Sequence, residues 1–275
     1  MENNNKVSEV FNFPRFGKYL IHDLRNAWSS YGVGLLTLAS MPLILYVANI
    51  LFHNVWDGVW TSPSLSARMS LFVLVLLIFT ISFPSRIYGN LTSKKEGSDY
   101  LMIPASRLEK FVSMLAVCLI AVPICYLGVY LLEDALLTLV DPTYTQSLAG
   151  ANFDNIVNND FVSDSDFSVG LIGGGYPAAF VSIAITILVF LLGALCFRKW
   201  KIGGTILVLF ALGTVLSLVL GVSLANRDFS GFETFIENHI DQLPSYLNWI
   251  SGIVNTVLFV LLGAGIYFRL KNLKH

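Results

Sequence analysis

Six apolar stretches, each about 20 residues long, divide this chain and constrain its fold more than any other feature. An α-helix rises about 1.5 Å per residue, so each stretch is long enough to cross the hydrocarbon core of a bilayer. Charged residues make up only 13% of the chain, against roughly 25% in a typical soluble domain. We therefore expect an all-α polytopic membrane protein with six transmembrane helices, at about residues 32–52, 69–88, 111–132, 177–197, 202–225 and 247–268.

The distribution of charge orients these helices. Cytoplasmic segments of membrane proteins carry an excess of Lys and Arg, and of the 17 such residues only Arg68 and Arg227 fall in segments expected outside. The amino and carboxyl termini are therefore predicted to lie in the cytoplasm, with the chain crossing the plasma (inner) membrane several times. The chain then divides into a cytoplasmic arm at 1–31, a transmembrane domain at 32–268 and a basic cytoplasmic tail at 269–275.

The arm contains a segment with helical periodicity, at residues 13–28. Its spacing predicts an amphipathic helix that lies on the inner leaflet and contacts lipid headgroups through its basic residues. An ordinary juxtamembrane segment with chance amphipathicity is the alternative. The expected apolar face carries Phe16, Tyr19, Leu20, Leu24 and Ala27, and the opposite face carries Lys18, His22 and Arg25.

The loop between the second and third stretches, residues 92–110, is the most strongly charged segment between two apolar runs. It combines Lys and Arg residues with the apolar patch at 100–103, a composition that suits the membrane surface and also a soluble partner. Pro104 is expected to end a short helix. Ser106 is expected to cap the next helix, with Glu109 at the third helical position completing a capping box.

The run E-G-S-x-x-L-x-x-P-A-S-R-x-E-K, at residues 96–110, resembles the loop after the second membrane helix in membrane subunits of ABC-2-type ABC transporters. It departs from the usual pattern in a shorter Gly-to-Pro spacing and in Ser98, where Thr is commoner. In that family the loop carries a coupling helix that docks on the ATP-binding subunit, and an elbow helix precedes the first span. The resemblance implies docking through Glu96, Gly97, Ser98, Tyr100, Pro104, Ser106, Arg107 and Glu109.

The same resemblance implies the partners and the direction of transport. The chain would bind an ATP-binding cassette ATPase subunit, pair with a second membrane subunit as a homodimer or heterodimer, and export its substrate. A non-transporting membrane scaffold, which recruits a different soluble protein through the same loop, is the alternative that the sequence leaves open. A membrane enzyme is disfavoured because no catalytic set is present.

Two segments are expected outside the membrane. Residues 133–176 are acidic and contain no Lys or Arg, which predicts a solvated loop with a short helix or a cap over an outer vestibule. The Asp-x-Asp spacing at Asp164 and Asp166 lacks the Gly and Glu of a calcium-binding EF-hand. Residues 226–246 have helical periodicity, which predicts an amphipathic helix on or in the outer leaflet.

Several kinds of chemistry are missing from the sequence. The predicted spans hold no Asp, Glu or Lys at mid-depth, so they show no coupling site for an ion-driven pump. Neither a P-loop motif nor a zinc-protease motif occurs. The three cysteines lie in apolar runs without ligand-spaced neighbours, which favours packing over metal binding. We therefore expect no catalytic, cofactor or metal residues, no enzyme activity and no binding to nucleic acid.

Overall fold

A computed structural model describes residues 11–56, 62–92, 102–141, 144, 148, 175–225 and 243–272. These residues are almost entirely helical, and no strand occurs among them. Five helices are long and apolar enough to cross a membrane, and Val181–Cys196 is a shorter apolar helix. The expectation of an all-helical chain suited to several membrane crossings is therefore confirmed at this level.

The chain begins with helix α2 (Phe13–Ala39), which is followed by α3 (Met41–Trp56). The sequence places a boundary between the interfacial helix and the first span at about residues 29–31, but α2 runs through this point without a break. The interruption comes at Ser40. Pro42 explains the position, because a proline has no N–H to donate to the carbonyl four residues earlier and its ring crowds that carbonyl.

The predicted second span is α4 (Leu65–Ile87), which leads into the short 3-10 helix η1 (Gly89–Thr92). Ser64 caps α4 by accepting a hydrogen bond from the Ala67 N–H at 3.3 Å. The side-chain hydroxyl therefore satisfies one of the N–H groups that a helix start leaves without a partner.

The predicted third span is one continuous helical segment, which we call the third rod. It consists of α6 (Arg107–Ala116), the π-helical turn η2 (Val117–Ala121) and α7 (Val122–Val140). Pro123 is the second residue after the π turn. Because proline lacks an N–H and crowds the carbonyl four residues earlier, a wider turn at this point lets the rod continue. The Val122 N–H accordingly donates to the Val117 carbonyl, five residues back.

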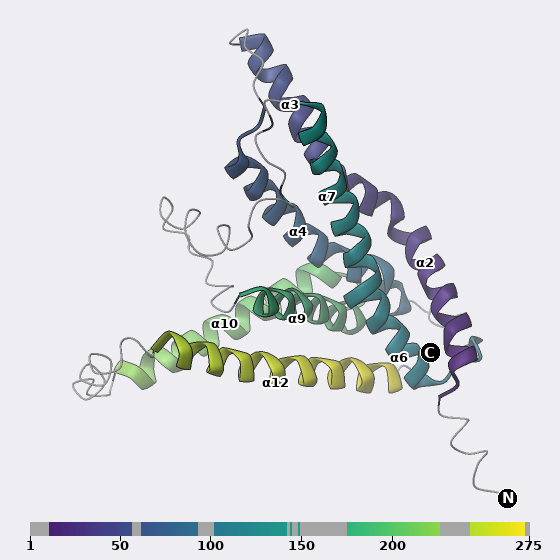
Figure 1. Cartoon of the computed structure of the whole chain (residues 1–275). Helices are drawn as coiled ribbons and strands as arrows, with labels where there is room; N and C mark the ends of the chain where they lie inside the picture. The colour runs from purple at the N-terminus through teal and green to yellow at the C-terminus, as the bar shows by residue number, and fades with distance from the viewer. Residues whose placement is uncertain are drawn as a thin grey trace, which may run out of the picture.

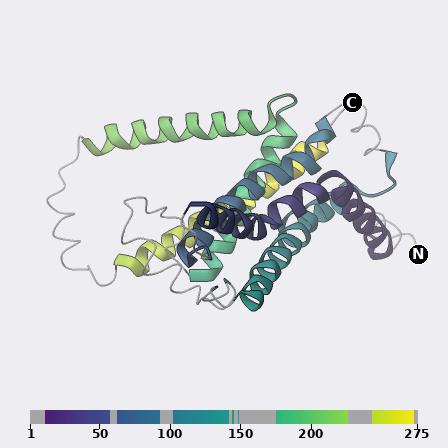
Figure 2. The same cartoon turned by 90° about the horizontal axis from the view of Figure 1, so that it is seen from above.

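The remaining described helices are α9 (Gly175–Cys196), α10 (Lys201–Ala225) and α12 (Leu243–Lys271), close to the predicted fourth, fifth and sixth apolar stretches. In Figure 1, α9 and α12 run side by side across the lower part of the group formed by α2, α4 and α7. Figure 2 shows α10 running apart from that group. Its apolar side chains from Ile206 to Val222 are correspondingly exposed, as suits a surface for lipid or a second subunit.

Aromatic rings form the centre of the core between α4 and α7. Phe79 of α4 stacks on Tyr126 of α7 with ring centroids 4.2 Å apart, and on Phe83 at 4.8 Å. All three side chains are fully buried. Tyr31 of α2 packs against both phenylalanines, so the same cluster holds three helices together.

Small residues bring α9 and α10 close together. A Cβ added to Gly193 would lie 2.8 Å from the Cβ of Thr205. One added at Gly204 would lie 2.9 Å from the ring of Phe197. The glycines therefore serve packing within one chain.

One sequence expectation is wrong, because Asp134 does not belong to a solvated outer loop. Helix α7 continues to Val140, eight residues beyond the predicted end of the span at 132, and buries Asp134. The carboxylate forms an ion pair with Arg68 of α4 at 3.0 Å and accepts the Leu148 N–H at 2.6 Å. Of the predicted outer loop at 133–176, the structure describes residues 133–141, 144, 148, 175 and 176. Residues 226–242 of the helix predicted at 226–246 lie outside the described residues, and its last four residues belong to α12.

Candidate partner-docking site

Half of the predicted docking residues lie in the described part of the chain. Pro104 and Arg107 are exposed, Ser106 is partly buried and Glu109 is fully buried. The other four, Glu96, Gly97, Ser98 and Tyr100, lie outside the described residues.

The predicted capping box at the start of α6 is present. The Glu109 N–H donates to the Ser106 hydroxyl at 3.1 Å, and the Ser106 N–H donates to the Glu109 carboxylate at 2.8 Å. These reciprocal bonds satisfy two N–H groups at the helix start. The cap therefore ends the loop and fixes the point at which the third rod begins.

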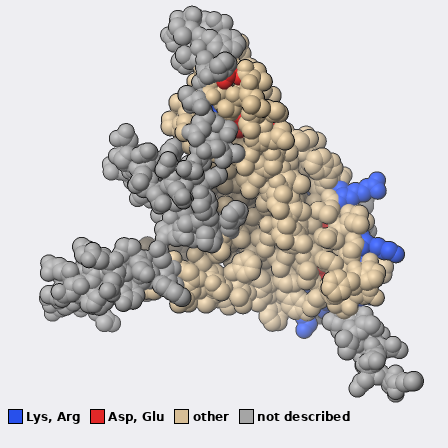
Figure 3. Space-filling model, viewed as in Figure 1, with Lys and Arg blue, Asp and Glu red and all other residues tan. Residues whose placement is uncertain are grey.

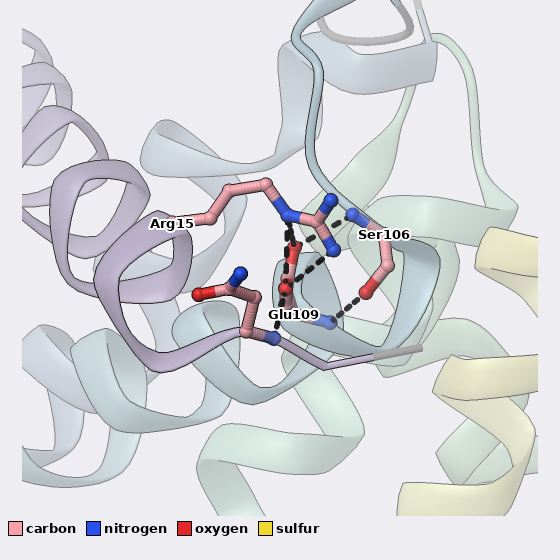
Figure 4. Close-up of polar contacts among 4 residues, drawn as sticks. Arg15, Ser106 and Glu109 are labelled. Atoms are coloured by element: carbon pink, nitrogen blue, oxygen red, sulfur yellow. Dashed lines mark hydrogen bonds and ion pairs between the residues drawn. The ribbon is translucent and has the colours of Figure 1, made fainter. Parts of the chain in front are cut away.

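Glu109 also connects the loop to the amino-terminal helix, as Figure 4 shows. Arg15 of α2 donates hydrogen bonds to the carboxylate from two nitrogens, Nε and Nη2, each 2.8 Å from a carboxylate oxygen. The Asn12 N–H, at the start of α2, donates to the same group at 2.8 Å. One carboxylate thus joins the starts of α2 and α6, although Arg15 and Glu109 are 94 residues apart in the sequence.

The electrostatics of this junction keep Glu109 ionised. Burial alone would raise the pKa of its carboxyl, but the Arg15 guanidinium and the N–H groups of Ser106 and Asn12 hold the pKa at about 2, below the ordinary 4.5. The same hydrogen bond raises the pKa of Arg15. The pair therefore stays charged throughout the neutral range.

A second buried carboxylate lies between the same elements. Asp23 of α2 accepts hydrogen bonds from the Tyr88 hydroxyl, just after α4, and from the Ser113 hydroxyl of α6, both at 2.8 Å. Burial raises the pKa of the Asp23 carboxyl, and the two hydroxyl bonds oppose that rise. Asp23 thus ties α2 to the elements on both sides of the loop.

Asp23 was not predicted from the sequence, although its position within the apolar face of α2 was a usable signal. It lies four residues from Tyr19 and four from Ala27, two members of the predicted apolar face, and all three are buried. An acidic residue in the middle of an apolar helical face indicates a buried polar contact. The opposite face, with Lys18, His22 and Arg25, is exposed as predicted.

The turn between α9 and α10 contacts η1, just before the loop. The Lys201 ammonium, at the start of α10, donates to the Asn90 side chain of η1 at 3.3 Å. At the end of α12, Arg269 donates to the Leu195 carbonyl of α9 at 3.1 Å. In Figure 3 the visible Lys and Arg side chains gather at the end of the molecule where α2 and α6 begin.

This arrangement connects three elements of the fold. It joins α2, α4 and the third rod through charged and hydroxyl groups, and it exposes Pro104 and Arg107 beside them. No group of three or more His, Cys, Asp or Glu residues with the geometry of a metal site occurs among the residues that the structure describes.

Comparison of the chain with protein-family models, with curated proteins and with solved structures gave no match.

Proposed function

We propose that the chain is the membrane-spanning subunit of an ATP-driven transporter of the ABC-2 type, with six transmembrane helices and both termini in the cytoplasm. In this proposal two such subunits, identical or different, pair in the plasma (inner) membrane. Each binds a separate ATP-binding cassette subunit through the loop at residues 92–110. The chain has no P-loop motif, so ATP hydrolysis belongs to that partner.

The observation that carries this proposal is the position of Glu109. This residue ends the loop, begins the third rod and binds the start of α2, so these three segments form one mechanical unit. When the ATPase closes on nucleotide, a displacement of the loop would move α2 and the third rod together. The path between two subunits would then switch from inward to outward access, and the substrate would be exported.

The roles within the loop follow from exposure. Arg107 is exposed, so it can contact the ATPase. Glu96 lies outside the described residues, and its contact with the ATPase is proposed from the sequence resemblance alone. Pro104 sets the bend before α6. Glu109 is buried, so its role is to hold the loop in place rather than to touch the partner.

The test is purification of the full chain from mild detergent, followed by identification of bound proteins and measurement of ATP hydrolysis. A P-loop protein should copurify, and Glu96→Ala with Arg107→Ala should lower its ATP turnover or its assembly several-fold without reducing membrane insertion. Arg198→Ala, at an exposed site in the other inner turn, is the matched control and should leave turnover unchanged.

A complex without any nucleotide-hydrolysing protein would contradict the proposal. If a soluble partner without ATPase activity bound through the same residues, the chain would be a membrane scaffold. Normal assembly and ATP turnover in the Glu96→Ala, Arg107→Ala variant would remove the docking role of the loop.

A further inference from the structure

A shallow groove lies between α2 and the third rod, at the point where η2 joins α7. Its cavity volume is about 60 Å³, so it can hold only a short length of a slender group. We call it the inner groove, and it is lined by Leu24, Ala27, Trp28, Tyr31, Gly32, Leu35, Ile87, Ala121, Val122 and Cys125.

Small side chains produce the hollow. Ala27 and Gly32 on α2 face Ala121, the last residue of the π turn. A Cβ added at Gly32 would approach the Trp28 ring to 3.1 Å, so this glycine lets the indole lie flat against its own helix. Trp28 is 57% exposed and Cys125 is exposed, so the groove opens to the outside of the helix bundle.

The lining favours an apolar occupant. Tyr31 contributes the only hydroxyl among the lining residues, and this group already shares a hydrogen bond of 2.6 Å with the Ser82 hydroxyl. A polar ligand in the groove would therefore lose its bonds to water without replacement. A hydrocarbon chain forms no hydrogen bonds with water, so it loses none when it enters the groove.

Two arginines adjoin lining residues of the inner groove in the sequence. Arg25 follows the lining residue Leu24, and Arg86 precedes the lining residue Ile87; both arginines are exposed. Arg86 is close enough to Tyr31 for its charge to act on the phenol. Within the described part of the chain, neither arginine forms an ion pair.

The two carboxylates that the structure describes on this side, Asp23 and Glu109, do not compete for those cations. Asp23 is buried against Tyr88 and Ser113, and Glu109 is buried against Arg15. The inner groove is thus apolar, with positive charge near it. It is complementary to a molecule that places a hydrocarbon chain in the groove and a negative group at the water boundary.

We propose that the inner groove binds one acyl chain of an anionic phospholipid from the inner leaflet, whose phosphate contacts Arg86 and Arg25. The lipid contacts both α2 and the third rod, the two elements that Glu109 joins. Bound lipid therefore stabilises one relative position of these helices. This inference depends on the chain lying in a membrane and does not depend on an ATPase partner.

The experiment uses the fluorescence of Trp28 as a probe inside the groove. The full chain in detergent micelles is titrated with phosphatidylglycerol brominated on its acyl chains, and in parallel with brominated phosphatidylcholine. Bromine quenches a tryptophan that it touches. Half-maximal quenching should need several-fold less of the anionic lipid, and Trp28→Phe should abolish that difference, since the four other tryptophans lie elsewhere in the sequence.

Two pairs of variants test the two parts of the proposal. Cys125→Phe fills the groove and should remove the preferential quenching, whereas Cys196→Phe, at another exposed cysteine, should retain it. Arg86→Gln should raise the requirement for phosphatidylglycerol to that for phosphatidylcholine, whereas Arg198→Gln should not. Helical content measured by circular dichroism verifies that each variant is folded.

Equal quenching by the two lipids would overturn the proposal, since it would reduce the groove to ordinary lipid contact. Preferential quenching that survives both Cys125→Phe and Arg86→Gln would place the anionic lipid elsewhere and would overturn it equally. Neither result would bear on ATP turnover, so failure here is distinct from failure of the transporter proposal.

Discussion

The two ends of the third rod are fastened in the same way but in different surroundings. At the end that the charge distribution predicts to be cytoplasmic, which we call the inner end, Glu109 binds Arg15 of α2. At the opposite end, which we call the outer end, Asp134 binds Arg68 of α4. Each carboxylate also accepts backbone N–H groups, from Asn12 and Ser106 at the inner end and from Leu148 at the outer end. The difference is in the cations, because the Arg15 side chain is 37% exposed and the Arg68 side chain 2%.

That difference has a mechanical consequence. Water can replace the contacts of a partly exposed guanidinium when a helix moves, whereas a buried ion pair that separates leaves two charges without solvation. The ring of Tyr144 covers Arg68 further, with its centroid 4.0 Å from the guanidinium carbon. We infer that the third rod is held more firmly to α4 at its outer end than to α2 at its inner end.

Breaking the outer pair is expected to have the largest effect. Arg68→Met leaves the Asp134 charge buried without its counter-ion and should lower the free energy of unfolding by about 3 to 5 kcal/mol. Unfolding in mixed detergent micelles gives the measurement. Arg68→Met combined with Asp134→Leu should recover most of the loss, because neither charge then remains buried.

A single variant that unfolded like the parent would show that the outer end is not fixed by this pair. A double variant no more stable than the single one would assign the loss to packing, or to the lost bond from the Leu148 N–H, instead of to an uncompensated charge.

Breaking the inner pair should have a smaller and more local effect. Arg15→Ala removes the paired bonds to Glu109 but leaves the bonds from Asn12 and Ser106, and water can reach the site. Amide hydrogen exchange should accelerate in the first turns of α2, with global unfolding changed less than by Arg68→Met. Lys18→Ala, at an exposed site on the same helix, should leave exchange unaltered.

Arg15→Lys sharpens this test, since lysine keeps the charge but cannot form the forked contact of a guanidinium. Exchange intermediate between parent and Arg15→Ala is expected. Unchanged exchange in both variants would mean that α2 is held at this end by other contacts.

Local sequence signals predicted the inner junction only in part. The capping box needs residues three positions apart, so Ser106 and Glu109 could be read directly, and the structure confirms them. Nothing local shows that Arg15, 94 residues earlier, closes on the same carboxylate. Such a contact depends on how α2 packs against α6, which hydrophobic periodicity does not determine.

The outer pair was missed for a different reason. Asp134 stands at the start of a strongly acidic segment, so composition assigned it to the loop with its neighbours. The available signal was Arg68, which is one of two exceptions to the charge asymmetry and directly precedes an apolar run. A lone cation at that position indicates a buried partner, but only the packing of α4 against α7 identifies which acid it is.

The inner junction should also respond to acid. The pKa of Glu109 is about 2 in the folded chain, below its ordinary 4.5. A depressed acid pKa contributes stability that is fully present above the ordinary value and is lost as the pH falls toward the folded value. Protection of the start of α2 should therefore decline between about pH 4.5 and pH 2.

Glu109→Gln separates this effect from general acid unfolding. The amide carries no titrating charge, so the variant should be less protected near neutral pH and should lose little more on acidification. Proteolysis within the first turns of α2, by an acid-stable protease below pH 5 and a neutral protease above it, gives the comparison. Parallel pH profiles for parent and variant would show that Glu109 does not control the junction.

The smallest expected effect concerns the hydroxyl contacts of Asp23. Ser113→Ala and Tyr88→Phe each remove one hydrogen bond from this carboxylate and should each cost about 1 kcal/mol of unfolding free energy. Ser85→Ala is the matched control, because the Ser85 hydroxyl is buried and finds no partner within the described residues. Removal of this hydroxyl should leave the free energy of unfolding unchanged or raise it slightly. Equal losses from Ser113→Ala and Ser85→Ala would reduce the Asp23 cluster to ordinary packing and leave Glu109 as the link between α2 and the third rod.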